Sequence, residues 1–437
     1  MNEYTILETF VGAGGAHIGF KENGFISRYV NDIEETTIKT LLYNNPEIKE
    51  TAYIDQRDIL TIKGEEILEK TGLQQGEADV FFSGIVCKGF SLAGQRSPND
   101  ERNYFYHKQL EFVDVVQPKI SIIENVPGIL NATVLSPETP IEIKNRIDSL
   151  WKELENYKGR KSSLRKQGEI PEEFELKGKE LTKERDFLLK YIKDNDYLIS
   201  VIDDIKNLYK KMGDKAKIKK LNSAWYGAST RRERIIIVAV RNDIGIEFKY
   251  PKPTHYSKAI SANFRGQKDN LKKYLPEKTV NDALNKIDYT KEDDLDNKPM
   301  NHREKTIRRF KYIPEGKNVV DVLDELPDEL KVSAFYSRGS TMRLDGNKSS
   351  PTLVPGHSNF PIHPRKHRSI TVREAAVITG FPLDYKFFGN HSKRCEHVGN
   401  AVPIELSNAL ARSSRELLDK YYSQKSSNNA IFSLSKE

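Results

Sequence analysis

Short apolar runs alternate with amphipathic stretches through the first third of the chain. The segments YTILETF (4–10), RYVNDIE (28–34), ADVFFSG (78–84) and PKISIIENV (118–126) have the length and the β-branched content of buried strands. Between the last two lies YHKQLEFVDVVQ (106–117), whose apolar positions recur at helical spacing. Repeated strand–helix units predict an α/β fold with a doubly wound, mostly parallel sheet. Ligands of such sheets bind at the carboxyl ends of the strands.

A highly charged stretch of roughly 136–194 interrupts this pattern. Its apolar residues recur at helical spacing, and the segment RKQGEIPEEF (165–174) breaks the pattern: the apolar positions are Ile143, Ile147, Leu150, Trp151 and Leu154. This predicts a helical hairpin inserted into the sheet domain. We interpret it either as a solvated arm or as an extra contact to nucleic acid or another partner. A further helix is predicted for 197–212, with one apolar face that packs on the sheet.

Composition narrows the class of protein. The chain has 437 residues, of which 37% are hydrophobic and 30% charged, and no apolar run is long enough to span a bilayer. The N-terminal residues lack the pattern of a secretory signal, so we expect a cytoplasmic protein of two domains without membrane contact. The two cysteines, Cys87 and Cys395, are far apart in sequence, which fits a reducing compartment. The net charge of +7 is compatible with a polyanionic partner.

The segment FVGAGG (10–15) is the first candidate for binding chemistry. It follows a predicted strand and opens a predicted helix, so its glycines permit a ligand to approach backbone N–H groups. Asp32 ends the next strand about 20 residues later, where an acid commonly accepts hydrogen bonds from ribose hydroxyls. The spacing GAGG departs from G-x-G-x-x-G. It therefore favours an adenosine-containing cofactor other than a dinucleotide.

Two further residues at strand ends have reactive side chains. Cys87 follows an apolar strand within a loop that contains glycine and serine, and Lys88 is next to it; nearby cations and N–H groups favour the nucleophilic thiolate. Glu124 ends another apolar strand and precedes Asn125 and Pro127. A carboxyl group that loses water at a buried strand end is more easily protonated and can donate a proton near neutral pH.

The order of these segments identifies a family. FVGAGG (10–15), SGIVCKGFSLAG (83–94), IIENVPGIL (122–130), LNSAWYGASTRRERIIIVAVRND (221–243), RSITVREAAVITGFP (368–382) and GNAVP (399–403) together resemble the ordered motifs of cytosine carbon-5 DNA methyltransferases of the bacterial restriction–modification type. The resemblance implies a Rossmann-like methyltransferase domain, S-adenosyl-L-methionine as cofactor and a cytosine of double-stranded DNA as target. It also implies a cognate restriction endonuclease that acts on the same site. We expect the enzyme to act as a monomer on DNA.

The resemblance also assigns roles to individual positions. It implies that Cys87 adds to carbon 6 of the cytosine, that Glu124 holds or protonates N3, and that Arg232 and Arg234 anchor the flipped nucleotide. The positions that match the cofactor site are Phe10, Gly12, Gly14, Asp32, Ile33, Asp58, Ile59, Gly84, Phe105, Asn400 and Val402. The residues expected to contact DNA are Lys88, Ser91, Arg96, Arg102, Arg338, Arg343 and Lys348. No metal site is expected.

Three segments are expected along the chain. Residues 1–248 form the catalytic domain with the helical insertion, 249–345 a smaller target-recognition domain, and 346–437 return to the catalytic domain and end in a helix. The family commonly has Pro and Gln where this chain has Val86 and Lys88, and Pro-Gln where it has Ser229 and Thr230. Two alternatives stay open: a catalytically weak or inactive DNA-binding relative, and a transfer-RNA cytosine-5 methyltransferase.

Overall fold

The protein is described from a computed structural model, which covers residues 3–85, 97–100, 104–256, 273–291, 293–334, 338–356 and 359–434. Its centre is a seven-stranded sheet in the order β3-β2-β1-β4-β5-β10-β8. The strands are β1 (Tyr4–Thr9), β2 (Phe25–Asn31), β3 (Tyr53–Asp55), β4 (Val80–Gly84), β5 (Ile120–Asn125), β8 (Lys215–Asn222) and β10 (Glu233–Val240). The predicted α/β fold with a largely parallel, doubly wound sheet is confirmed.

The strand order reverses at β1. β1 pairs in parallel with β2 on one side and with β4 on the other, and β4 pairs in parallel with β5. Such a reversal opens a crevice beyond the carboxyl ends of the two central strands. β10 runs antiparallel between β5 and β8, so the beginning of β10 lies at the same edge as the end of β5. The segments that contain the predicted site residues therefore meet at one edge of the sheet.

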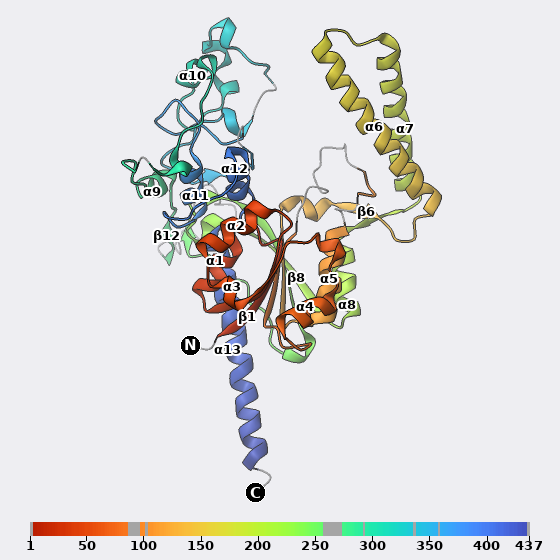
Figure 1. Ribbon diagram of the computed structural model, residues 1–437, viewed down its shortest axis with the longest axis vertical. Helices are drawn as coiled ribbons and strands as arrows, with labels where there is room; N and C mark the ends of the chain where they lie inside the picture. The colour runs from red at the N-terminus through yellow and green to blue at the C-terminus, as the bar shows by residue number, and fades with distance from the viewer. Residues whose placement is uncertain are drawn as a thin grey trace.

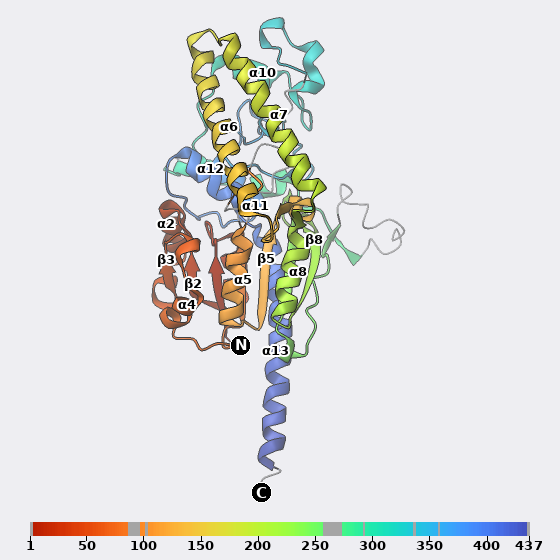
Figure 2. The ribbon, with the colours of Figure 1, turned by 90° about the vertical axis from the view of Figure 1, so that its right-hand side faces the viewer.

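Helices cover both faces of the sheet (Figures 1 and 2). One face is covered by α1 (Gly15–Glu22) and α13 (Ile404–Leu434), which pack through Phe20, Leu406 and Leu410. The other face is covered by α4 (Gly64–Thr71), α5 (Phe105–Val116) and α8 (Val201–Lys211). The predicted helix at 197–212 is shorter than expected, because residues Leu198–Ser200 form a strand, β7, before α8 begins. The remaining helices beside β2 are α2 (Glu35–Asn44) and α3 (Ile48–Thr51).

The predicted hairpin consists of α6 (Ile141–Gln167) and α7 (Glu172–Asp194). Its root is the antiparallel pair of β6 (Thr133–Leu135) with β7. The two helices share a small core of their own, and α6 ends at Gly168 in a left-handed conformation. We call α6 and α7 the arm. It stands above the sheet in both views (Figures 1 and 2).

The segment that follows the sheet, from residue 249 onward, contains short elements: β11 (His255–Tyr256), β12 (Leu275–Pro276), α9 (Val280–Leu284) and α10 (Glu304–Lys311). α11 (Val372–Thr379) and α12 (His391–Asn400) follow, before α13 returns to the sheet. A two-stranded pair of β9 (Thr230–Arg231) with β13 (Ser350–Pro351) connects this segment to the start of β10. Within the described part of the chain, every helix is too short or too polar to span a lipid bilayer.

Candidate active site

The glycine-containing segment forms a loop between β1 and α1. Phe10, Gly12 and Gly14 all have positive φ angles, of 51°, 60° and 90°. Only glycine adopts this region readily, and a Cβ on Gly14 would lie 2.8 Å from both Leu41 and the Tyr385 hydroxyl. Gly12 and Gly14 are therefore required by the course of the backbone. The loop presents its backbone at the switch point of the sheet.

The ends of β2 and β3 lie beside this loop. The Asp32 carboxylate accepts the Gly12 N–H at 3.0 Å and the Glu34 N–H at 3.0 Å. Burial raises the pKa of the Asp32 carboxyl from its usual value, while these two hydrogen bonds act in the opposite direction. Ile33, the next residue, is 65% exposed, which is unusual for a large apolar side chain beside a buried loop. An exposed isoleucine beside a carboxylate matches the face and the hydroxyls of a nucleoside.

The remaining cofactor candidates lie at neighbouring positions. The aromatic rings of Phe10 and Phe105 are 5.4 Å apart, and a Cβ on Gly84 would lie 3.4 Å from the Phe10 carbonyl oxygen. Asp58 is exposed and caps the short helix of residues 59–61, whereas Ile59 is buried below it. Asn31 links the two strand ends, because its amide donates to the carbonyls of Asp55 and Arg57.

The C-terminal block packs against the start of α1. A Cβ on Gly15 would lie 2.4 Å from the Val402 carbonyl oxygen, so the two backbones are in direct contact. The Ser407 hydroxyl also donates to the Gly15 carbonyl at 2.9 Å. Val402 is buried and Asn400 is exposed at the end of α12. Residues almost 400 positions apart in sequence thus meet at the glycine loop.

Glu124 and Arg234 form a buried ion pair at the carboxyl end of β5. In the ladder Glu124 lies opposite Ile236, so Arg234, two residues earlier in β10, points to the same face of the sheet. The Arg234 Nε lies 2.6 Å from the Glu124 Oε1, and the two side chains are 7% and 10% exposed. A Cβ on Gly84 would lie 3.9 Å from the other carboxylate oxygen of Glu124. The acid is therefore adjacent to the end of β4, which also borders Phe10 of the glycine loop, and it is held by a fixed cation.

Arg232, between β9 and β10, is held by backbone groups. It is 5% exposed, and its guanidinium donates to the Leu353 carbonyl at 3.1 Å. Its backbone pairs with Ser223, whose hydroxyl accepts the Arg232 N–H. An open pocket of about 570 Å³ lies beside Arg234; it is lined by Val126, Pro127, Asn222, Arg231, Glu233, Arg234, Pro351 and Thr352. A planar base has room at this position.

Several predicted residues lie outside the described residues: Cys87, Lys88, Ser91, Arg96 and Arg102, together with Val86. The chain is described up to Ile85, which directly precedes their segment. The Asn125 side chain donates to the Ile85 carbonyl at 3.3 Å, so the end of β4 is tied to the residue that follows Glu124. Cys87 is two residues beyond this bond in sequence.

The predicted DNA contacts Arg338, Arg343 and Lys348 differ in position. Arg338 is exposed, and Lys348 is exposed and forms an ion pair with Asp345 at 2.6 Å. Arg343 is 3% exposed, and its guanidinium donates to the backbone carbonyls of Phe310, Ile313, His363, Pro364 and Lys366. Arg343 therefore joins the backbone at Phe310 and Ile313 to that of residues 363–366, and the expectation that it contacts DNA is corrected.

Two buried polar clusters near the site were not predicted from the sequence. The Thr9 hydroxyl, at the end of β1, donates to the Gln109 amide oxygen at 2.6 Å and shares a second hydrogen bond with the Ser83 hydroxyl at 2.9 Å, and so ties β4 and α5 to the strand before the glycine loop. Below that loop, Glu8 accepts hydrogen bonds from His17 and Ser27, each at 2.8 Å. Isolated Thr, Ser and His residues in apolar runs have no distinctive spacing, so only tertiary contacts reveal these clusters.

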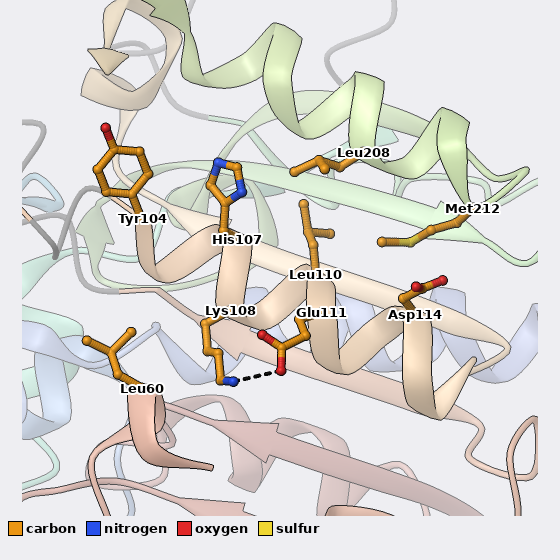
Figure 3. A pocket seen from close by; sticks show the side chains of 9 residues that line it. All are labelled: Leu60, Tyr104, His107, Lys108, Leu110, Glu111, Asp114, Leu208 and Met212. Atoms are coloured by element: carbon orange, nitrogen blue, oxygen red, sulfur yellow. Dashed lines mark hydrogen bonds and ion pairs between the residues drawn. The ribbon is translucent and has the colours of Figure 1, made fainter. Parts of the chain in front are cut away.

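A second depression, of about 450 Å³, lies on the outer side of α5 (Figure 3). Leu60, Tyr104, Leu208 and Met212 contribute apolar surface, and Lys108 pairs with Glu111 at 2.7 Å. None of the predicted catalytic residues that the structure describes lines this depression. We do not assign it to the reaction.

Comparison of the sequence with known families gives a single assignment. The model of the C-5 cytosine-specific DNA methylase family matches residues 4–150 and 191–416. The chain belongs to this family. As a member it is a DNA cytosine-5-methyltransferase, and the family implies S-adenosylmethionine as methyl donor.

Sequence relatives cover almost the whole methyltransferase. The type II methyltransferase M.Eco47II of Escherichia coli is 27% identical over 427 residues, which cover 96% of this chain and 80% of the relative. The type II methyltransferase M.NgoFVII of Neisseria gonorrhoeae is 25% identical and covers 96% of this chain and 89% of its own length.

Solved structures support the fold of the methyltransferase. A prophage-encoded E. coli protein, described as a DNA modification methyltransferase, superimposes with a TM-score of 0.57 at 20% identity and covers 95% of this chain and 100% of its own. A mutant of DNMT2 from Spodoptera frugiperda gives a TM-score of 0.51 at 17% identity and covers 94% of this chain and 99% of its own.

Proposed function

We propose that this methyltransferase transfers a methyl group from S-adenosyl-L-methionine to carbon 5 of a cytosine that is flipped out of a specific duplex sequence. The buried pair of Glu124 with Arg234 supports the proposal most directly, because it combines a fixed acid and a fixed cation next to Gly84, which borders the glycine loop. A base inside a duplex is out of reach of such a site. Extruding the base costs a few kcal/mol, and its contacts in the pocket offset this cost.

The residues around the glycine loop fit the cofactor. Asp32 is positioned to accept hydrogen bonds from ribose hydroxyls, and the exposed Ile33 and the Phe10–Phe105 pair offer apolar surface to adenine and to the cofactor chain. Asp58, exposed at the end of the neighbouring strand, is assigned to the adenine amino group. When bound, the cofactor supplies an electrophilic methyl group on a sulfonium.

The protein activates the base, since carbon 5 of cytosine is a weak nucleophile. In the proposed mechanism the Cys87 thiolate bonds to carbon 6, and Glu124 holds or protonates N3, so that electron density moves to carbon 5. Arg234 keeps Glu124 in place, and with Arg232 it offers donors to the base carbonyl and the nucleotide. After methylation, loss of the carbon-5 proton expels the thiolate and restores the aromatic ring.

We further propose that methylation protects the host genome from a cognate restriction endonuclease. The type II methyltransferases among the relatives support this role. Bisulfite sequencing of DNA from an expressing host should show one methylated sequence motif. Transfer of labelled methyl groups to duplex DNA and to RNA then tests the substrate: transfer to DNA is expected, whereas transfer to RNA alone, or to neither, would overturn the proposal.

A further inference from the structure

The arm is absent from the family model that matches the rest of the chain. The two matched regions end at residue 150 and resume at 191, which leaves out most of α6 and α7. The arm nevertheless stands above the sheet, across from the recognition segment that contains α9 and α10 (Figure 1). A DNA duplex that enters between the arm and the segment with α9 and α10 would therefore pass along the arm.

One line of exposed residues along α6 consists of hydrogen-bond donors, and the acids Asp148 and Glu155 border it on one side. Residues spaced alternately four and three apart share one face of a helix. On α6, one such series lies away from the core that the two helices share, and its residues are polar and exposed: Asn145, Ser149, Lys152, Asn156, Ser163 and Lys166. Gly159 occupies the remaining position of the series. We call this series the α6 outer face. It is about 30 Å long at 1.5 Å per residue.

The side chains of the α6 outer face are of the types that bind phosphate. Lysine, serine and asparagine are among the side chains that contact the phosphates and sugars of DNA. The short side chains around Gly159 allow close approach, and none of the described residues forms an ion pair with Lys152 or Lys166.

Charge distinguishes the two helices of the arm. From Asn156 to Gly168 there are five Lys and Arg residues and no acid. α7 contains seven acidic and six basic residues, and three of the acids lie in its first turn. Some of the cations of α6 serve the arm itself, since Lys161 pairs with Glu175 at 2.7 Å and Arg146 with Glu184. These pairs lie between the helices, whereas Lys152 and Lys166 belong to the outer face.

The arm is also bonded to the segment that follows the predicted nucleophile loop. The Asn99 amide donates to both carboxylate oxygens of Asp148 in α6, at 3.0 and 2.9 Å. Tyr104, in front of α5, donates to the Leu135 carbonyl at the root of the arm. These hydrogen bonds therefore connect the arm with the residues that follow the predicted nucleophile loop.

We infer that the α6 outer face binds the sugar–phosphate backbone of the duplex beyond the target sequence. This inference rests on the proposed function, because it takes duplex DNA as the substrate. It adds a contact surface that the family model does not contain.

The test compares Lys152→Gln/Lys166→Gln with the matched control Lys179→Gln/Lys183→Gln, which removes the same charge from exposed positions of α7. Binding is measured over a range of salt concentrations to two duplexes with the methylated motif: one that ends at the motif and one extended on both sides. For the extended duplex, the α6 variant should lower the slope of log affinity against log salt by about 0.9 per lost phosphate contact. The control variant should match the parent protein.

Three outcomes would overturn the inference. The α6 variant could bind the extended duplex like the parent protein, which would assign the face to another partner. Both variants could lose affinity equally, which would indicate net charge alone. The α6 variant could also lose as much affinity for the short duplex as for the extended duplex. Methyl transfer to the short duplex by the α6 variant is measured in parallel, and should equal that of the parent. If the parent protein itself transfers no methyl group to the duplex, this result contradicts the proposed function and not this inference.

Discussion

Among the described residues, Arg234 is the only cation that forms an ion pair with Glu124, and replacing Arg234 by methionine removes it. The arginine Nε lies 2.6 Å from the carboxylate, and both side chains are about nine-tenths buried. Methionine fills similar volume without charge. The substitution therefore leaves a carboxylate buried at the end of β5 without a counter-charge.

The expected cost follows from this burial. Removing one partner of a buried ion pair destabilises a protein by about 3–5 kcal/mol, because the other charge stays desolvated. Replacing both groups, in Glu124→Gln/Arg234→Met, removes the charge as well as its partner. The double variant should therefore be more stable than the sum of the single effects predicts, by about 1–3 kcal/mol.

The assay is urea denaturation of the four proteins of this cycle, followed by circular dichroism. Lys220→Met is a matched control, because Lys220 of β8 pairs with Glu233 of β10 at 3.2 Å and both side chains are exposed; its loss should cost less than about 1 kcal/mol. Additive effects of the two substitutions, within about 0.5 kcal/mol, would refute the argument that the pair acts as a unit.

Three further predictions concern the cofactor site and the packing of the C-terminal helix. Asp32→Asn should weaken cofactor binding about 10- to 100-fold in calorimetry, as expected for a lost charge-assisted hydrogen bond; unchanged affinity would remove Asp32 from the cofactor site. Gly15→Ala should destabilise the fold by about 1–3 kcal/mol in urea, because its Cβ would lie 2.4 Å from the Val402 carbonyl oxygen; wild-type stability would contradict the packing of these backbones. Burial raises the pKa of Glu405 from 4.5 to about 7, so the folded protein retains a proton that the unfolded chain has lost, and stability falls as the pH rises through this window. Glu405→Gln should remove most of that fall, at most about 3 kcal/mol, when denaturation is measured below and above the window; an unchanged pH dependence would reject this explanation.

The fold could be predicted because its signals are local. Apolar runs of strand length, separated by a helical period, indicate β1, β4, β5 and α5 without knowledge of their neighbours. The arm was also predictable, since Gly168 and Pro171 interrupt a strong helical pattern. The contact between Glu124 and Arg234 could not be predicted from local patterns. It depends on the antiparallel register of β10 beside β5, which no local pattern indicates.

The role of individual cations was the least predictable feature. Arg343 and Lys348 belong to the same basic and aromatic segment, and nothing in their sequence neighbours separates them. The structure surrounds Arg343 with backbone carbonyls and leaves Lys348 exposed. Likewise, the contact of Gly15 with Val402 joins the two ends of the chain, and only the closed fold brings them together.

The mechanism is tested most directly with a duplex whose target cytosine has fluorine at carbon 5. If Cys87 bonds to carbon 6, methyl transfer leaves no proton for the elimination, and the protein stays bonded to the DNA. We predict a complex that persists on a denaturing gel, requires S-adenosyl-L-methionine and is absent with Cys87→Ser. Absence of this complex for the parent protein, with cofactor and DNA both shown to bind, would contradict the proposed mechanism.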